Sequence, residues 1–439
     1  MSDLKLNRKQ FLRMGASAAA LAALSNVLGP VSALAADALS VAWWGEGDQN
    51  KRTGEALKAF TAKSGIATDP QGTNFNGYFD RLATQVAGGN PPDVFQVYLA
   101  NMAQYAARGT AADLGDLLGD GKAIDTSDWS PAAKDSTGLG GTNYFVPLGL
   151  STQPAIIYDK TLLDGLGVTL KPDWTLAEFK DTCQQIGKAL SKSKQGAEAF
   201  GCDDFGGQVP VLEAFVRSKG RNVFTDGGQL AMTKDDLTEW YELWNEGRTD
   251  GWVVPPQAQQ QGGFEATALI RGIAPFAVAA SSKGLQGFQS LTKNDLNFNP
   301  WPRYSGDSER IELVTPVEWM VISSSTARKE DAAKLLSFLV NDEAAITAMG
   351  IAHGVPLSAK MRKQFMDGGK LSPVELKIYQ NVEDALPHSK PRVIFPAGSG
   401  PLLGPGSNLL TLLNQQIAFK QTSVQAAVDR FFSEAARNL

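Results

Sequence analysis

Cysteine and histidine are scarce in this chain, whose 439 residues include 2 of each. A zinc site needs three or four such ligands close together, and the sequence has neither a C-x-x-C pair nor clustered histidines. His353 and His388 lie far apart in the sequence, and we expect both to be structural or solvated. The sequence therefore predicts no metal site.

Long apolar runs and catalytic motifs are missing as well. Beyond the first 36 residues, no run approaches the roughly 20 apolar residues that span a bilayer. The sequence contains no G-x-S-x-G, H-E-x-x-H, G-x-x-x-x-G-K-[ST] or G-x-G-x-x-G motif. Ser191 and Lys194 fit S-x-x-K, but without the companion motifs of the enzymes that use it. These absences predict a soluble body that is not an enzyme and uses no cofactor.

Basic charge is not in excess either. The chain has 41 Lys and Arg against 46 Asp and Glu, a formal net charge of −5. Because the first 36 residues carry a net charge of +3, the chain without them has a charge of −8. No basic stripe is visible, so neither nucleic acid nor an anionic membrane surface is an expected partner.

The first 36 residues read as a targeting segment that is cleaved from the mature chain. A basic stretch precedes an alanine- and leucine-rich stretch, and small residues allow cleavage after Ala35 or Ala36. The run from Asn7 to Arg13 resembles a twin-arginine signal with Lys9 in the second arginine's place, which leaves the general secretory route open. No cysteine for lipid attachment lies near the cleavage site. We therefore predict a periplasmic protein that is free of the membrane.

The two cysteines, Cys183 and Cys202, form an even pair in a chain that we expect to be exported. An oxidising compartment favours a disulfide between them. Such a bridge would close a loop of about 20 residues and stabilise the fold by roughly 3 kcal/mol. Two separately buried thiols are the alternative.

The hydrophobic pattern of the mature chain alternates strands with helices. Apolar runs at 39–44 and 94–97 have the length of buried strands, and residues 51–64 and 78–87 have a helical apolar face. This alternation predicts a parallel sheet covered by helices. Apolar residues recur at helical spacing from Val424 to Ala435, which predicts a C-terminal helix packed on the body. Because the length exceeds what one core supports, we expect two α/β lobes.

Polar side chains follow the first strand directly. Glu46, Asp48, Gln49 and Arg52 come after Trp44, at the end of a strand where open α/β sheets bind ligands. An aromatic ring beside donors and acceptors suits a sugar, because the C–H face of a sugar stacks on the ring and its hydroxyls need hydrogen bonds when buried. A solvated acidic turn is the alternative interpretation of the two carboxylates.

The segment from Tyr78 to Val97 carries a family resemblance. Its helix runs into a glycine-rich turn and then Pro92-Asp93-Val94, and it resembles the family-1 extracellular solute-binding proteins, the maltose-binding-protein-like receptors of ABC sugar importers. Trp43-Trp44-Gly45 is similar to the opening strand of that family, and later segments follow in its order over most of the mature chain. Pro275-Phe276-Ala277 departs from the family, which often has a small residue and Met there.

The resemblance implies a periplasmic-binding-protein-like fold, with two α/β lobes, a hinge and a ligand cleft between the lobes. We expect residues 37–148 with about 277–325 in the first lobe, and about 149–276 with about 326–439 in the second. The resemblance also implies that the chain binds a sugar or small oligosaccharide, without chemistry, and delivers it to the membrane permease subunits of an ABC importer. We expect the receptor to be a monomer.

Further ligand contacts are expected along this cleft. Trp301 and Trp319 are candidates for stacking, and Glu318 lies in a segment where the family lines its cleft. Phe205 and Gln208 represent the second lobe. The full set of expected ligand-binding residues is Trp44, Glu46, Asp48, Gln49, Arg52, Tyr78, Gln96, Phe205, Gln208, Ser281, Trp301, Glu318, Trp319 and Arg392.

Two other functions stay open at this point. A secreted carbohydrate-active enzyme, a lyase or a glycosidase, would use Glu46 and Asp48. Glycosidases hold two carboxyl groups roughly 5–9.5 Å apart on opposite sides of the bond, which neighbours in one loop do poorly. The same fold is also able to bind a polyol, an amino-acid derivative or a peptide.

Overall fold

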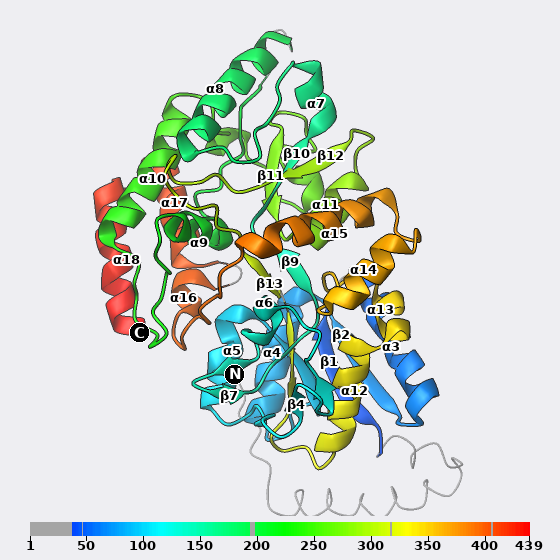
Figure 1. Ribbon diagram of the computed structural model, residues 1–439. Coiled ribbons are helices and arrows are strands. Elements are labelled where there is room, and N and C mark those ends of the chain that lie inside the picture. Colours follow the sequence, from blue (N-terminus) through cyan, green and yellow to red (C-terminus); the bar gives the residue numbers. More distant parts are fainter. Residues whose placement is uncertain (1–36, 46, 194–197, 317, 405–406) are drawn as a thin grey trace, which may run out of the picture.

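Two α/β lobes, one above the other in Figure 1, make up the protein. The computed structural model describes residues 37–45, 47–193, 198–316, 318–404 and 407–439. The targeting segment predicted at 1–36 lies outside these residues. Among the described residues, no helix is long and apolar enough to cross a membrane. The predicted two-lobed α/β fold is confirmed.

The sheet of lobe 1 has the strand order β2-β1-β3-β14-β8. Its strands are β1 (Leu39–Trp44), β2 (Thr68–Thr73), β3 (Val94–Val97), β14 (Trp319–Ile322) and β8 (Val146–Pro147). β1 pairs in parallel with β2 and β3, whereas β14 is antiparallel to β3 and β8. Both apolar runs predicted as strands are therefore central strands. The residues of β2 are exposed or partly exposed, which suits its place at the edge of the sheet.

Helices cover both faces of this sheet, because successive side chains of a strand point to opposite faces. Trp44 packs with α4 (Phe75–Ala87) and α5 (Leu99–Ala107), whereas Trp43 packs with α3 (Gly47–Ser64) and α12 (Lys329–Asn341). The helix α13 (Glu343–Met349) packs on α3. The helix predicted at 51–64 begins earlier, at Gly47, so Asp48 and Gln49 lie in its first turn.

Lobe 2 is built on the antiparallel sheet β11-β10-β12. Its strands are β10 (Ala155–Asp159), β11 (Phe276–Ala279) and β12 (Leu296–Asn299). The helices are α7 (Lys160–Gly165), α8 (Leu176–Ser193), α9 (Val209–Ser218), α10 (Lys234–Thr249), α11 (Ser281–Gln289), α15 (Pro373–Ala385), α16 (Gly400–Leu403), α17 (Leu409–Ala418) and α18 (Val424–Asn438). α18 packs on α10 and α17 and buries Val428 and Phe431, so the predicted C-terminal helix is confirmed.

The predicted lobe boundaries need correction in two places. Residues 277–301, expected in lobe 1, lie in lobe 2, because β10 pairs with both β11 and β12 and Trp301 packs on Phe179. Residues 329–353, expected in lobe 2, pack in lobe 1 as α12, α13 and the segment up to His353. Strand pairing decides the first assignment and helix packing the second, and a local hydrophobic pattern contains neither.

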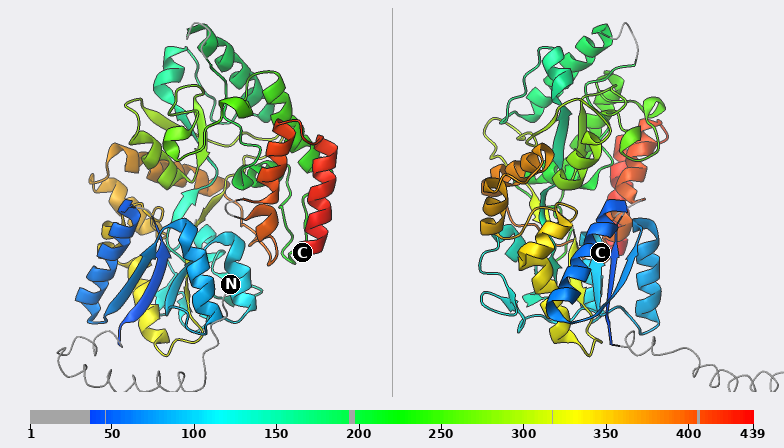
Figure 2. Two further views of the ribbon diagram at one scale, coloured as in Figure 1. Left: turned by 180° about the vertical axis from the view of Figure 1, so that it is seen from behind. Right: turned by 90° about the vertical axis from the view of Figure 1, so that its right-hand side faces the viewer.

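The chain crosses between the lobes three times. β9 (Leu150–Thr152) and β13 (Val314–Pro316) cross side by side as an antiparallel pair, and α14 (Ala359–Asp367) leads from α13 to α15. The crossings occupy the middle of the molecule in both views of Figure 2. Short elements complete the chain: β4 (Leu118–Gly119), β5 (Ile124–Asp125), α6 (Pro131–Lys134), β6 (Gly138–Leu139), β7 (Thr142–Asn143), η2 (Pro256–Ala258), η3 (Phe264–Ala266) and η4 (Leu386–His388).

The predicted disulfide is not present. Cys183 on α8 and Cys202 are free, buried thiols that form a hydrogen bond with each other. The two segments pack closely at Gly201. A Cβ there would lie only 1.9 Å from the carbonyl oxygen of Cys183, so the contact requires glycine. Burial raises the pKa of the Cys202 thiol well above its usual value, which keeps the thiol protonated and unreactive.

A buried carboxyl group lies beside the crossing strands. Glu312 is 2% exposed, its Oε1 accepts a hydrogen bond of 3.0 Å from Arg310 Nε, and its backbone N–H donates to His388 O at 3.1 Å. Burial raises the pKa of Glu312 to about 7, although Arg310 opposes the shift. The stability that this group contributes is present below its unfolded pKa and is lost as the pH rises through about 7.

We expect Glu312→Gln to remove this pH dependence. The difference in the free energy of unfolding, variant minus wild type, should rise by roughly 2 kcal/mol between pH 5 and pH 8. The reason is that the wild-type carboxyl group must ionise in a buried position over this range, whereas the amide stays uncharged. Urea unfolding across this pH range measures the difference. Glu309→Gln, at an exposed carboxylate, is the control. Parallel curves for the Glu312 variant and the wild type would contradict the assignment.

Candidate functional site

The polar end of the lobe 1 sheet faces lobe 2. β1 and β3 run toward the other lobe, and α3, α4 and α5 begin where β1, β2 and β3 end (Figure 1). The first turns of these helices therefore lie at the boundary between the lobes. Open α/β sheets bind ligands at this edge.

Four aromatic rings gather at this edge, and we call Trp44, Phe75, Tyr78 and Phe79 the aromatic group. The ring centroid of Trp44 lies 5.8 Å from Phe75, 5.2 Å from Tyr78 and 5.3 Å from Phe79. Trp44 and Tyr78 are buried, whereas Phe75 and Phe79 keep part of their surface exposed. The Trp44 ring, expected to stack on the ligand, is only 4% exposed, and its neighbours Phe75 and Phe79 on α4 present the accessible aromatic surface instead.

Tyr78 and Gln96 hold the strand ends in place. The Tyr78 hydroxyl donates to Gln96 O at 2.7 Å and accepts from Gln96 N at 2.9 Å. Gln96 Oε1 accepts a hydrogen bond of 3.0 Å from the backbone N–H of Trp44. Burial raises the pKa of Tyr78, so its hydroxyl stays protonated. Both residues are enclosed. We therefore assign them the role of positioning Trp44, in place of the direct ligand contact that the sequence predicted for them.

A charged cluster joins the lobes, and we call Gln49, Lys283, Glu318 and His353 the Glu318 cluster. Gln49 Nε2 donates to the two carboxylate oxygens of Glu318 at 3.2 and 3.3 Å. Lys283 Nζ forms an ion pair with Glu318, and His353 Nδ1 hydrogen-bonds to the same carboxylate. Lys283 comes from α11 of lobe 2, whereas the other three belong to lobe 1.

The Glu318 carboxylate is 1% exposed and stays ionised. Burial alone would raise the pKa of Glu318, but Lys283 and His353 outweigh burial and lower the pKa to about 2. A carboxylate with this pKa is a poor proton donor or acceptor near neutral pH. The arrangement therefore suits electrostatic positioning of Lys283 and Gln49 rather than acid–base chemistry.

A second charged contact lies near Tyr98, the residue before α5. Arg392 Nε donates to Glu213 Oε1 at 2.9 Å, and its Nη2 donates to the other oxygen. Burial raises the pKa of Tyr98, the nearby Arg392 lowers it and Glu213 raises it again. Arg217 donates to Lys390 O at 3.0 Å and fixes the segment that carries Arg392. Arg392 is thus at the boundary, as expected, but its guanidinium already has a carboxylate partner.

Several expected ligand residues lie away from the boundary. Trp301 and Phe205 are at most 3% exposed, and their rings pack on Phe179 and Trp244 inside lobe 2. Gln208 lines a separate hollow beside Thr411 on lobe 2. The assignment of these three residues to the cleft is corrected, because tertiary packing separates positions that look equivalent by residue type.

The remaining expected residues have structural partners. Asp48 and Arg52 form an ion pair one helical turn apart on α3. Ser281 Oγ accepts the Thr152 N–H at 3.0 Å and ties α11 to β9. Trp319 is 1% exposed, and its indole N–H has no hydrogen-bond partner among the described residues. Glu46 lies outside the described residues.

The sequence reasoning missed Lys283, Phe75, Phe79 and Tyr98, and it treated His353 as structural. Phe75 and Phe79 show the helical spacing of one apolar face, which reads as core. Lys283 follows β11 of lobe 2 in the sequence, whereas Glu318 belongs to lobe 1. No local sequence pattern therefore connects the two residues. Among the described residues, no group of three or more Cys, His, Asp or Glu is arranged to hold a metal ion.

Comparisons with known proteins agree with this architecture. The diacetylchitobiose binding protein DasA of Streptomyces coelicolor is 31% identical over 134 residues, which is 30% of this chain and 30% of that relative. An ABC substrate-binding protein from Listeria monocytogenes, solved with cycloalternan, has a TM-score of 0.73 at 18% identity, with 91% of this chain and 98% of that chain covered.

A periplasmic oligogalacturonide binding protein from Yersinia enterocolitica, solved with saturated digalacturonic acid, has a TM-score of 0.74 at 20% identity and the same coverage of 91% and 98%. At these identities the solved structures support the fold alone. The match that shows the family is with the bacterial extracellular solute-binding protein model, over residues 46–346. The chain belongs to the family of bacterial extracellular solute-binding proteins.

Proposed function

We propose that this protein binds a sugar or small oligosaccharide between its two lobes and delivers it to the membrane permease of an ABC importer. The observation that carries the proposal is the pairing of the aromatic group with the Glu318 cluster at the boundary of the lobes. Aromatic rings stack on the C–H faces of a sugar, and the amide of Gln49 and the ammonium of Lys283 are donors to its hydroxyls.

The charges at the boundary support a neutral ligand. Glu318 is paired with Lys283, and Glu213 is paired with Arg392. An ionic ligand would have to displace one of these partners and leave a buried charge uncompensated, which costs several kcal/mol. A hydroxyl-rich ligand makes hydrogen bonds with the same groups and leaves the pairs intact.

The relatives support a saccharide ligand. Their names and complexes refer to diacetylchitobiose, cycloalternan and saturated digalacturonic acid, all of which are built from sugar units, although the last carries carboxylates that a neutral ligand lacks. We infer for this chain a saccharide of two or more units, together with export to the periplasm. A polyol or peptide ligand is the alternative that binding measurements distinguish.

An enzymatic function finds little support in the described carboxylates. Asp48, which the hydrolase alternative needs, is paired with Arg52 at the surface. Glu318 is saturated by partners and stays ionised. Neither is placed to exchange a proton with a substrate.

We expect a saccharide to bind in a 1:1 ratio and to leave unchanged. A thermal-shift screen with diacetylchitobiose, maltose, saturated digalacturonic acid and cyclic glucans should identify one class of ligand. Calorimetry then measures the stoichiometry of binding. A ligand at about 100 times its Kd stabilises the protein by roughly 2.7 kcal/mol. Chromatography of the recovered ligand tests for turnover, and cleaved sugar or binding restricted to peptides would contradict the proposal.

The aromatic group provides a second test. We expect Phe75→Ala to weaken binding of the sugar found in the screen about fivefold, because one ring contact is worth roughly 1 kcal/mol. Phe419→Ala, at a phenylalanine 53% exposed beyond α17, is the matched control and should leave the affinity unchanged. Calorimetry on folded variants measures both. Equal affinities for the Phe75 variant and the wild type would remove the aromatic group from the site.

The Glu318 cluster provides a third test. We expect Lys283→Met to weaken sugar binding about tenfold, because it removes a charge-assisted donor at the boundary. Lys293→Met changes an exposed lysine of the same lobe and should have no effect. Circular dichroism checks that both variants fold. If affinity stays the same in a folded Lys283 variant, the ammonium group does not contact the ligand.

A further inference from the structure

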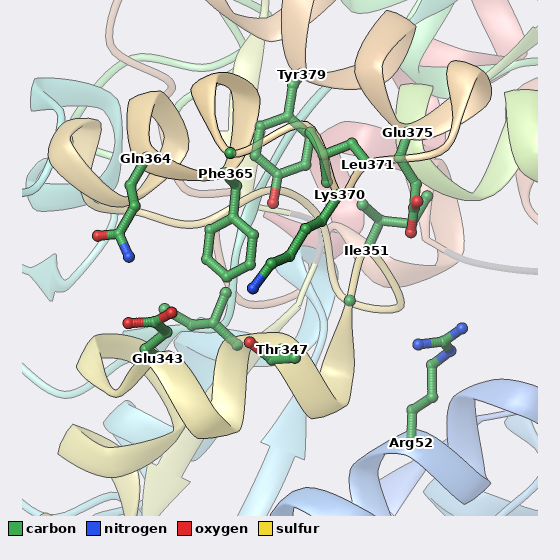
Figure 3. Close-up of a pocket in the computed structure, with 13 residues that line it drawn as sticks. Arg52, Glu343, Thr347, Ile351, Gln364, Phe365, Lys370, Leu371, Glu375 and Tyr379 are labelled. Atoms are coloured by element: carbon green, nitrogen blue, oxygen red, sulfur yellow. The ribbon is translucent and has the colours of Figure 1, made fainter.

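A cavity lies on the side of the molecule where α13 meets α14 and α15. It has a volume of about 250 Å³, and Figure 3 shows the residues that line it. Its floor comes from α3 and α13 of lobe 1, and its roof comes from α14, the loop after it and α15. α15 is tied to lobe 2, since Lys377 on α15 donates to Leu296 O at 2.7 Å. We call this cavity the α13–α15 chamber; it shares no residue with the Glu318 cluster.

The hydroxyl group of a buried tyrosine points into the chamber. Tyr379 is 2% exposed as a residue, its hydroxyl is directed toward the cavity in Figure 3, and no hydrogen bond to it occurs among the described residues. Burial raises the pKa of Tyr379 far above its usual value, so the hydroxyl remains a hydrogen-bond donor at physiological pH. The hydroxyl oxygen is accessible from the chamber, where a bound molecule can accept its hydrogen bond.

Two opposite charges face each other across the same space. Lys370 extends into the chamber from the roof and Glu343 from the floor (Figure 3). Both residues are exposed, and neither side chain forms an ion pair or a hydrogen bond in the described part of the chain. A molecule that carries both charges would find an opposite charge for each of them.

The other charged groups of the chamber are already engaged. Arg52 pairs with Asp48, and Glu375 accepts the Ser372 N–H at 2.8 Å as part of the N-terminal cap of α15. The rest of the wall is mixed. Ile346, Ile351, Phe365 and Leu371 are apolar, Thr347 and Gln364 are polar, and Gly350 and Gly368 add no side chain. Among the described residues, the chamber thus combines a cation and an anion without ion-pair partners, hydroxyl and amide groups, and an apolar surface.

We propose that the α13–α15 chamber binds a small zwitterion with an apolar side chain, of the class of free hydrophobic α-amino acids. The ligand's carboxylate meets Lys370 and the Tyr379 hydroxyl, its ammonium meets Glu343, and its side chain packs on Phe365 and the aliphatic wall. A ligand with one charge leaves either Lys370 or Glu343 without a counter-charge. This site is independent of the sugar site and does not depend on the function proposed above.

Calorimetry on the full chain with three probes of one shape tests the proposal. L-leucine carries both charges, 4-methylpentanoate lacks the ammonium and 3-methylbutylamine lacks the carboxylate. We expect L-leucine to bind in a 1:1 ratio and each single-charge probe to bind roughly tenfold more weakly or worse. The absence of saturable L-leucine binding up to about 20 mM, or equal binding of all three probes, would overturn the proposal.

Variants locate the binding. Lys370→Met and Tyr379→Phe should each weaken L-leucine binding, the first about tenfold and the second about fivefold. Lys360→Met, on α14 but not among the lining residues, is the matched control. Saccharide binding by the same variants shows that they are folded. L-leucine binding that survives both Lys370→Met and Tyr379→Phe would overturn the assignment to this chamber.

Discussion

The buried ion pair between Glu318 and Lys283 is the constraint on which the boundary of the lobes depends. A carboxylate that is 1% exposed is stable only with a compensating charge, and this charge comes from the other lobe. Gln49 and His353 complete its hydrogen bonds from lobe 1. The pair therefore fixes where α11 meets β14, and with it the relation between the edge of lobe 1 at which α3 and α4 begin and the first turn of α11 in lobe 2.

Local patterns in the sequence were enough for the elements of the fold but not for their partners. The apolar runs at 39–44 and 94–97 are strands, because a buried parallel strand needs a continuous apolar stretch. The lobe boundaries were wrong at 277–301 and 329–353, because strand pairing decides the first and helix packing the second, each between segments a hundred or more residues apart. The cysteines illustrate the same limit: the chain brings Cys183 and Cys202 together, but their bonding state is not encoded in their spacing.

The site was predicted where chain order and sheet geometry coincide. Trp44 and Gln49 follow β1 and lie at the edge that the strand direction requires. Gln49 donates to Glu318, 269 positions away, whereas the sequence predicted a ligand contact for each residue and no contact between them. Trp301 and Phe205 were misplaced because an aromatic residue has the same pattern in a core as in a binding surface, and only burial separates the two.

Charge compensation distinguishes the two sites that we propose. At the boundary of the lobes, Glu318 and Glu213 each have a basic partner supplied by the protein, so a ligand there would bring hydrogen bonds and apolar surface rather than charge. In the α13–α15 chamber, the exposed side chains of Lys370 and Glu343 face each other without contact, and a zwitterion would replace the solvent that compensates them. The proposed ligand class depends in both places on whether the protein has already paired its own charges.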